Sequence, residues 1–244
     1  DPEGAAVSYT YSWSVDGELS LASTTDRLPS DATRKGQSWT IQVTPNDGSA
    51  DGPSATATAA IINTVPSITT ATITPTTPSS TDILTCTATG ATDDDADTVS
   101  LEVAWIVDDV VLTGRGDTLG STDFSPGSFI SCEVTPSDDE GSGISVSSTE
   151  VRINVPPVLH SASISPTLPT VLDVLSCNEG LKTDADGDTV TTSVRWFINT
   201  IDIGVTTTSL DSSWFAKDDV VHCEVTPSDP IEPGAPVVSD SVTI

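Results

Sequence analysis

Methionine is missing from this sequence, histidine occurs twice, and only eight basic residues accompany 36 acidic ones. The resulting formal net charge of −28 repels the phosphate backbone of nucleic acids and the headgroups of anionic membranes. No apolar run approaches the roughly 18 residues that a membrane span needs. We therefore expect neither nucleic-acid binding nor membrane insertion. Because the chain has no methionine, residue 1 is not a translation start, and we expect a processed protein or part of a larger one.

Residue sets that carry catalysis are also scarce. The four cysteines form no CxxC pair, and with only two histidines this disfavours a zinc site. A Ser/His/Asp set is implausible, since His160 falls at a repeat boundary and His222 on a strand. Glycoside hydrolysis needs two acids across a cleft, whereas the acidic residues here cluster on short loops. We predict that the chain is not an enzyme.

The residues that are abundant are typical of short β-strands. Valine, isoleucine and threonine are frequent, and 16 glycines and 17 prolines divide the chain at short intervals. β-branched residues favour strands, while Gly and Pro favour the turns between them. The composition predicts an all-β protein with thin, sandwich-type cores.

An internal repeat of 91 residues organises the chain. The heptapeptide CEVTPSD occurs at 132–138 and again at 223–229, and IQVTPND takes the corresponding place at 41–47. The boundary sequences IINTVPSI at 61–68 and RINVPPVL at 152–159 recur at the same offset. The alignment predicts three units: an incomplete repeat at 1–65 that lacks its first two strands (A and B), and complete repeats at 66–156 and 157–244.

Cysteine and tryptophan recur at fixed spacing in the two complete repeats. The cysteines of each repeat are 46 positions apart, with a tryptophan 19 positions after the first. This order is typical of an immunoglobulin-like sandwich, in which a disulfide joins strands B and F and a strand C tryptophan packs on it. The first repeat keeps Trp13 but has Ile41 in place of the second cysteine. We predict disulfides Cys86–Cys132 and Cys177–Cys223, and hence an extracellular or cell-surface location, because such bridges persist in oxidising compartments.

The third repeat gives the most complete strand prediction. Apolar alternation and turn signals place strand A near 160–166, B near 173–179, C near 190–198, F at 219–227 and G at 236–244. In the first repeat the tryptophan strand ends in Asp16-Gly17, a strong hairpin signal. We expect Trp39 and Trp214 to have structural roles rather than to bind a ligand.

Several motifs resemble a known group of domains. These are the acidic loop TDADGDT at 183–189, the strand YSWSVDG at 11–17, the VTPSD strand ends and the N-x-x-P boundaries. They are similar to the tandem Ig-like repeats, related to PKD and cadherin-like repeats, of very long exported bacterial surface proteins and adhesins. The resemblance covers the whole chain. It implies immunoglobulin-like β-sandwich domains in an extended array that acts as a spacer or adhesive stalk, often stiffened by calcium.

The acidic loop lies between strands B and C, at the same end of the sandwich as the F–G loop. In a tandem array this end faces the link from the preceding repeat, so oxygen ligands from three segments converge. Calcium takes about six to eight oxygens with loose geometry. The predicted ligands are Asp184, Asp186, Asp188, Asp229 and Asn154 in the third repeat, and Asp93, Asp95, Asp97, Asp138 and Asn63 in the second.

An ordinary solvated turn is the alternative, because Asp and Gly favour turns without any ion. The loop is not an EF-hand. Counted from Asp184, the glycine, Gly187, is the fourth residue and not the sixth, and the twelfth residue is Arg195 and not a glutamate. The second repeat has Ala96 in place of the glycine. The first repeat matches the set only in Asp1, Glu3 and Asp47, with Ala5 in place of the third aspartate.

We therefore expect a structural or adhesive repeat segment of an exported bacterial surface protein or extracellular filament, stiffened by disulfides and by calcium at the domain junctions. Its expected partners are neighbouring repeats of the same or an identical chain, and a surface ligand or host cell. The alternative is a module that binds carbohydrate or a host protein and is appended to an exported enzyme. Exposed aromatic side chains gathered on one face would favour that alternative.

Overall fold

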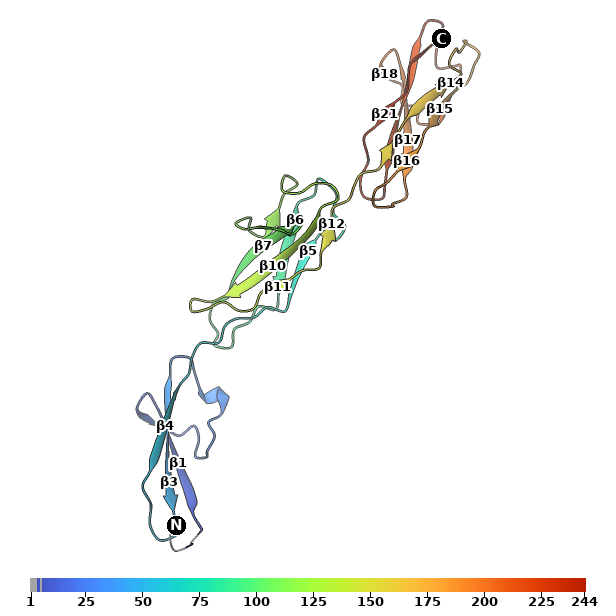
Figure 1. Ribbon diagram of the computed structural model, residues 1–244. Helices are drawn as coiled ribbons and strands as arrows, with labels where there is room; N and C mark the ends of the chain where they lie inside the picture. The colour runs from blue at the N-terminus through green and yellow to red at the C-terminus, as the bar shows by residue number, and fades with distance from the viewer. Residues whose placement is uncertain (1–3, 5) are drawn as a thin grey trace. The chain divides into compact units, whose positions relative to one another are not determined.

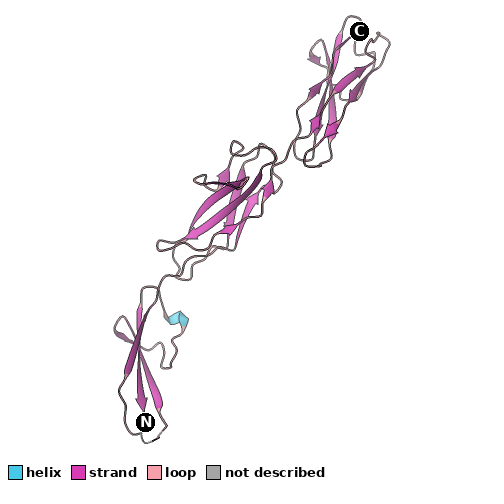
Figure 2. Cartoon of the chain, in the orientation of Figure 1, coloured by secondary structure: helices cyan, strands magenta, loops and turns pink. Residues whose placement is uncertain are grey.

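The computed structural model describes residue 4 and residues 6–244. Within them the regular structure is β-strand, apart from one short 3-10 helix, η1 (Ser30–Ala32) (Figure 2). The prediction of an all-β protein is confirmed. No helix in this part of the chain has the length and apolarity needed to cross a membrane. The acidic positions Asp1 and Glu3 lie outside the described residues, as does Ala5.

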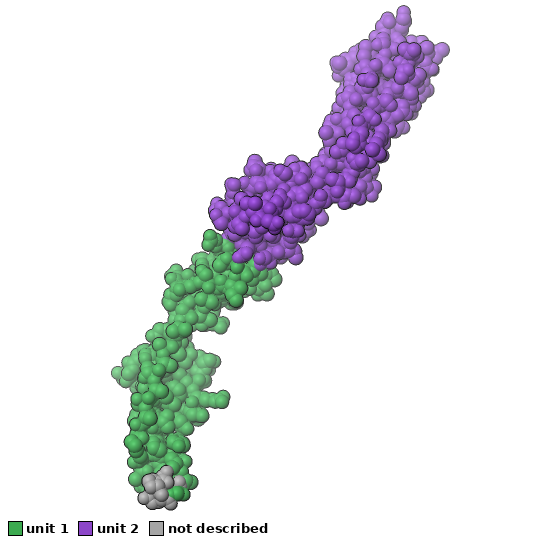
Figure 3. All heavy atoms as spheres, in the orientation of Figure 1, with its two compact units in different colours: residues 1–70, 88–102, 134–146 green, residues 71–87, 103–133, 147–244 purple. Residues whose placement is uncertain are grey.

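The chain divides into two compact units (Figure 3). Unit 1 consists of residues 1–70, 88–102 and 134–146, and unit 2 of residues 71–87, 103–133 and 147–244. Each unit holds the link between two repeats together with the loops of the repeat that follows the link. The two links can therefore be described separately, each within its own unit.

The third repeat contains two antiparallel sheets (Figure 1). One sheet has the order β14-β15-β19, from β14 (Ala162–Ser165), β15 (Leu175–Glu179) and β19 (Ser209–Leu210). The other has the order β18-β17-β20-β21, with β22 also on β20, from β17 (Thr191–Ile198), β18 (Ile201–Asp202), β20 (Val220–Ser228), β21 (Val237–Val238) and β22 (Val242–Thr243). A short antiparallel pair, β13 (Val158–Leu159) and β16 (Lys182–Thr183), forms a separate two-stranded sheet. In immunoglobulin nomenclature β14, β15 and β19 are strands A, B and E of one sheet, and β18, β17, β20 and β21 are strands C′, C, F and G of the other.

A disulfide and a tryptophan form the centre of this sandwich. Cys177 on β15 is bonded to Cys223 on β20, which joins the two sheets. Trp196 on β17 pairs in register with Cys223 and is fully buried. Its indole N–H donates to the carbonyl of Thr207 at 2.8 Å, so the one polar atom of the side chain is satisfied. A disulfide between strands B and F with a strand C tryptophan packed on it is the immunoglobulin-like arrangement.

The second repeat has the same strand order. Its strands are β5 (Thr70–Thr74), β6 (Leu84–Thr89), β7 (Ser100–Val107), β8 (Val110–Leu112), β9 (Thr118–Leu119), β10 (Phe129–Ser137), β11 (Val146–Ser147) and β12 (Val151–Arg152). The sheets are β5-β6-β9 and β11-β10-β7-β8, with β12 on β10. Cys86 and Cys132 form the second predicted disulfide, and Trp105 is fully buried. Both disulfide predictions are confirmed.

The described residues of the first repeat form one sheet, of order β2-β1-β3-β4. Its strands are β1 (Ser8–Val15), β2 (Glu18–Ser20), β3 (Ser38–Asn46) and β4 (Ala55–Ala60), which correspond to C, C′, F and G. Trp13 and Trp39 lie edge to face at a centroid distance of 6.5 Å on this sheet. Trp39 is 4% exposed, so its predicted structural role is confirmed. The apolar side of the sheet is only half-buried elsewhere, for example at Ile41 and Val43.

The tryptophan strand of every repeat ends in the same two-residue turn. The turn residues all have positive φ and are Asp16-Gly17, Asp108-Asp109 and Asn199-Thr200. Positive φ at both central residues defines the type I′ hairpin turn. The first turn residue also carries an acceptor: Asp16 Oδ1 accepts the N–H of Ser38 at 2.8 Å, and Asn199 Oδ1 accepts that of Val220 at 3.0 Å. An Asp or Asn at this place thus ties the hairpin to strand F.

Thr200 is the least suitable residue for its turn, because it is β-branched and has φ 71°. We expect Thr200→Gly to stabilise the third repeat by about 1 kcal/mol, since the left-handed region costs an L-residue roughly that much. Calorimetry of the full chain would detect this as a rise in one unfolding transition. The reciprocal change Gly17→Thr should lower the stability of the first repeat. An unchanged transition for Thr200→Gly would contradict this account of the turn.

Candidate cation sites at the repeat junctions

Each link between repeats meets two loops of the repeat that follows. We call the link at 61–66 with the loops of the second repeat the first junction, which lies within unit 1. The link at 152–157 with the loops of the third repeat is the second junction, which lies within unit 2. The ten predicted metal ligands fall into these two junctions as two sets of five.

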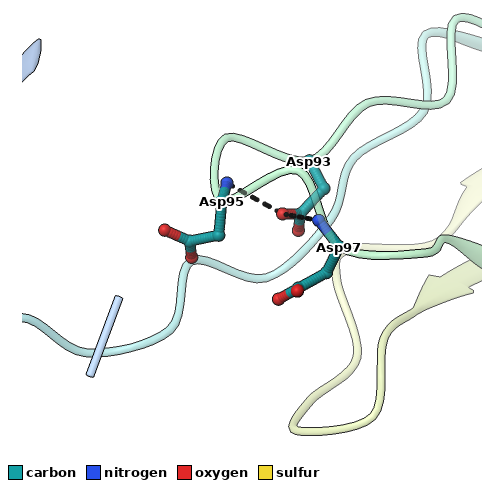
Figure 4. Close-up of side chains that lie close together, drawn as sticks. All are labelled: Asp93, Asp95 and Asp97. Atoms are coloured by element: carbon teal, nitrogen blue, oxygen red, sulfur yellow. Dashed lines mark hydrogen bonds between the residues drawn. The ribbon is translucent and has the colours of Figure 1, made fainter. Parts of the chain in front are cut away.

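The acidic loops are built around their first aspartate. Asp184 Oδ1 accepts the backbone N–H groups of Asp186 at 2.8 Å and Asp188 at 3.0 Å. Asp93 Oδ1 makes the same two bonds in the second repeat, to the third and fifth residues of its loop, at 2.8 and 3.1 Å (Figure 4). In each loop the three carboxylates place oxygens within 4.8 Å of one another. Alternation along the loop therefore gathers three negative charges.

One oxygen of the first aspartate in each loop has no hydrogen-bond partner among the residues that the structure describes. These oxygens, Asp93 Oδ2 and Asp184 Oδ2, are both buried. A buried carboxylate oxygen without a partner is costly, because it has lost its water without gaining a donor. A cation close to the loop would remove this cost and the repulsion between the carboxylates.

The link asparagine of each junction anchors the F–G loop. Asn154 is 4% exposed, and its Nδ2 donates to Asp229 Oδ2 at 2.9 Å and to Glu232 Oε1 at 3.1 Å. Asn63 Nδ2 donates to Asp138 Oδ2 at 2.9 Å in the first junction. These asparagines and F–G aspartates are thus brought together as the sequence predicted, although nothing in the contacts requires a metal between them.

The next link residue anchors the acidic loop. The N–H of Val155 donates to Asp186 Oδ2 at 2.7 Å, and the N–H of Thr64 donates to Asp95 Oδ2 at 2.6 Å. The middle aspartate of each loop is therefore held by the link backbone.

Within the described part of the chain, the amide oxygen of Asn154 is left without a partner. Because Nδ2 donates to two carboxylates, the orientation of the amide is fixed and Oδ1 is the atom without a hydrogen bond. Asn154 lines a surface cavity of about 270 Å³ together with Asp186, Asp188 and Arg152. A buried amide oxygen beside a cavity lined by carboxylates fits a cation that is bound through oxygen.

Lys35, which the sequence analysis did not single out, lies in the first junction. Its ammonium donates to Asn63 Oδ1 at 3.1 Å, contacts Glu140 Oε1 at 2.8 Å and forms an ion pair with Asp97. The hydrogen bond to Asp97 and then that to Glu140 hold the pKa of Lys35 above its ordinary value. Lys35 is therefore a permanent positive charge at this junction.

Arg152 is the second basic residue that sequence reasoning missed. Its guanidinium pairs with Asp186 and lies 5.7 Å from the ring centroid of Phe129. Arg152 is a link residue, so its charge reaches the acidic loop from the preceding repeat. Lys35 and Arg152 are two of only eight basic residues in the chain, and this scarcity was the sequence signal that could have identified them.

The F–G aspartates also stabilise their own loops. Asp138 Oδ1 accepts two backbone N–H groups, from Glu140 at 2.7 Å and Gly141 at 2.6 Å. The hydrogen bond from Asn63 and then these N–H groups lower the pKa of Asp138. Burial favours a higher pKa for Asp229, but the bonds from Asn154 and from its own loop lower the pKa overall. Asp47 caps the corresponding loop of the first repeat, where it accepts N–H groups at 2.7 and 2.8 Å.

A glycine permits close approach of the F–G loop to the link in each junction. A Cβ at Gly234 would overlap the carbonyl oxygen of Pro157, and a Cβ at Gly143 would overlap that of Pro66. In the second junction Glu232 also accepts hydrogen bonds from the backbone N–H and hydroxyl of Ser80, at 3.1 and 2.7 Å. The loops are therefore packed against the preceding repeat by backbone as well as by charge.

No protein-family model matches the chain, and no curated protein matches it. Among solved structures the chain is similar to domains A168–A170 of titin, with 10% identity over 96% of this chain and 87% of that one and a TM-score of 0.36. The FN1–FN3 domains of chicken CNTN1 align at 11% identity over 97% and 88%, with a TM-score of 0.36. Murine CEACAM1b aligns at 13% identity over 72% and 98%, with a TM-score of 0.30. The assignment of immunoglobulin-like sandwiches rests on the strand order and disulfides of this chain.

We expect Gly234→Ala to destabilise the second junction by about 2 kcal/mol, because an added methyl group has to displace backbone. Hydrogen exchange should become faster at the N–H of Val155, which reports the contact between link and loop. Gly120→Ala is the matched control, since a Cβ there meets nothing within 4 Å. Equal exchange at Val155 in both variants would show that the loop does not depend on this close contact.

Proposed function

We propose that this chain is a structural segment of an exported bacterial surface protein or extracellular filament, in which successive immunoglobulin-like repeats are held together by charge at their junctions. It serves as a spacer or adhesive stalk and has no catalytic role. Two disulfides, one in each complete repeat, support an extracellular or cell-surface location. Its direct partners are the neighbouring repeats of the same or an identical chain.

We further propose that the second junction binds calcium. The observation that carries this proposal is the unpartnered Oδ1 of Asn154. The residue is only 4% exposed and lines the same cavity as Asp186 and Asp188. Asp184 Oδ2, also buried without a partner, adds a second free oxygen. A hard cation that accepts oxygen ligands in loose geometry suits such a set, and calcium is the common one outside cells.

Calcium would give the junction a specific mechanical role. The proposed ligands come from the link and from the acidic loop, and the link asparagine is already bonded to the F–G loop. An ion shared by these segments would oppose their separation, so movement of one repeat against the next would require loss of ligands. Arg152 would share the acidic loop with the ion, because it pairs with Asp186.

The alternative of a sugar-binding module receives less support from the tryptophans. Trp214 is 48% exposed, whereas Trp105 and Trp196 are fully buried and Trp39 is 4% exposed. Trp13 is half-buried and packs against Trp39. The five tryptophans of the chain thus supply one exposed ring and not a row of them.

We expect calcium in hundredfold excess over its dissociation constant to stabilise the third repeat by about 2.7 kcal/mol, because a ligand that binds only the folded state stabilises it by mass action. Calorimetry with calcium and with chelator measures the shift. Asp184→Asn should abolish the shift because it removes the charge of the carboxylate. The asparagine keeps an Oδ1 that can accept the backbone N–H groups of Asp186 and Asp188, so the loop stays ordered. Asp109→Asn removes the same charge from a hairpin turn and should leave the shift intact. A wild-type chain that melts identically with calcium and with chelator would rule out the calcium site.

A further inference from the structure

The two junctions share the bond from the link asparagine to the F–G aspartate and the bond from the next link N–H to the acidic loop, but they differ in the basic residue that reaches the acidic loop. Gly36 and Gly127 are 91 positions apart, which is the repeat length, so they mark the same place in successive repeats. Each donates its N–H to a carbonyl of the link that follows, at 2.9 Å. The residue before Gly36 is Lys35, whereas the residue before Gly127 is Pro126. A proline has no charge and no N–H donor.

Lys35 joins all three segments of the first junction. Its ammonium contacts Asn63 of the link, Asp97 of the acidic loop and Glu140 of the F–G loop. An ammonium has three N–H donors, and these three oxygens can use all of them. The side chain is also partly shielded, with 24% of its surface exposed.

The equivalent oxygens of the second junction lack this donor. Asn63 Oδ1 accepts from Lys35, whereas Asn154 Oδ1 has no partner among the described residues. Arg152 does not replace Lys35, because its guanidinium pairs with Asp186 and not with Asn154. Glu140 also has no equivalent, since the corresponding residue of the third repeat is Ile231.

We propose that Lys35 is the built-in cation of the first junction, where it takes the place that a metal ion takes in the second and excludes a metal from it. The exclusion follows from occupancy of the link amide oxygen. The ammonium of Lys35 already holds Asn63 Oδ1 together with Asp97, whereas Arg152 pairs with Asp186 and leaves Asn154 Oδ1 open, so a metal ion in the first junction would have to displace the ammonium. The part of this inference that concerns metal in the second junction rests on the function proposed above. The chain then has one junction that is independent of calcium and one that responds to it.

The first arm of the test needs no metal. In the presence of chelator, Lys35→Gln should make hydrogen exchange at the N–H of Thr64 roughly tenfold faster, because the loss of a charged hydrogen-bond partner weakens the junction. Lys35→Arg keeps the charge and should retain slow exchange, which separates loss of the cation from loss of the fold. Lys217→Gln is the matched control, since Lys217 holds the same position in the third repeat and is exposed. Equal exchange at Thr64 in Lys35→Gln and wild type would overturn the inference, whether or not calcium binds.

The second arm counts calcium ions by equilibrium dialysis. We expect one ion for the wild type, for Lys35→Arg and for Lys217→Gln, and two for Lys35→Gln, where the Asp93 loop becomes available. Two ions in the wild type, or still one in Lys35→Gln, would overturn the exclusion of metal by Lys35. A wild-type chain that binds no calcium would instead contradict the function proposed for the second junction, and the first arm would then decide the role of Lys35 alone.

Discussion

Crowded carboxylates are the constraint on which the junctions depend. Three aspartates within one short loop repel one another, and partial burial strengthens the repulsion by lowering the local dielectric. Backbone N–H groups neutralise part of this charge, since Asp184 and Asp186 each accept them. Lys35 and Arg152 bring positive charge to the loops from the preceding repeat, and the proposed ion would balance more of the remainder in the second junction. The same groups that make each loop unstable alone therefore favour its attachment to the neighbouring repeat.

The sandwich supplies the geometry for this attachment. The disulfide between β15 and β20 and the buried Trp196 fix the two sheets of the third repeat, so the B–C and F–G loops leave the core at defined places. Asn154 then reaches the F–G loop, and Val155 the acidic loop. The glycine at 234 lets backbone meet backbone at the same end. The disulfide-linked core of the third repeat therefore sets the positions of the loops that form the second junction.

Strand positions were accessible from the sequence, because a 91-residue repeat aligns equivalent strands and the cysteine–tryptophan spacing identifies B, C and F. The meeting of the link with the F–G loop, through Asn154 and Asp229, and with the acidic loop, through Val155 and Asp186, followed from the known ends of a sandwich. Lys35 and Arg152 could not be found this way, since each lies in the repeat before the loop that it contacts. Their roles depend on side-chain reach across a link, which spacing along the chain does not encode.

The central claim is that a bound ion restrains the second junction. Spin labels can be attached at Thr113→Cys and Thr206→Cys, which are exposed sites of the second and third repeats. Pulsed electron paramagnetic resonance would then measure the distribution of distances between the two labels. Calcium should narrow this distribution in the wild-type background and leave it broad when Asp184→Asn is added. A distribution of the same width with calcium and with chelator would contradict the account.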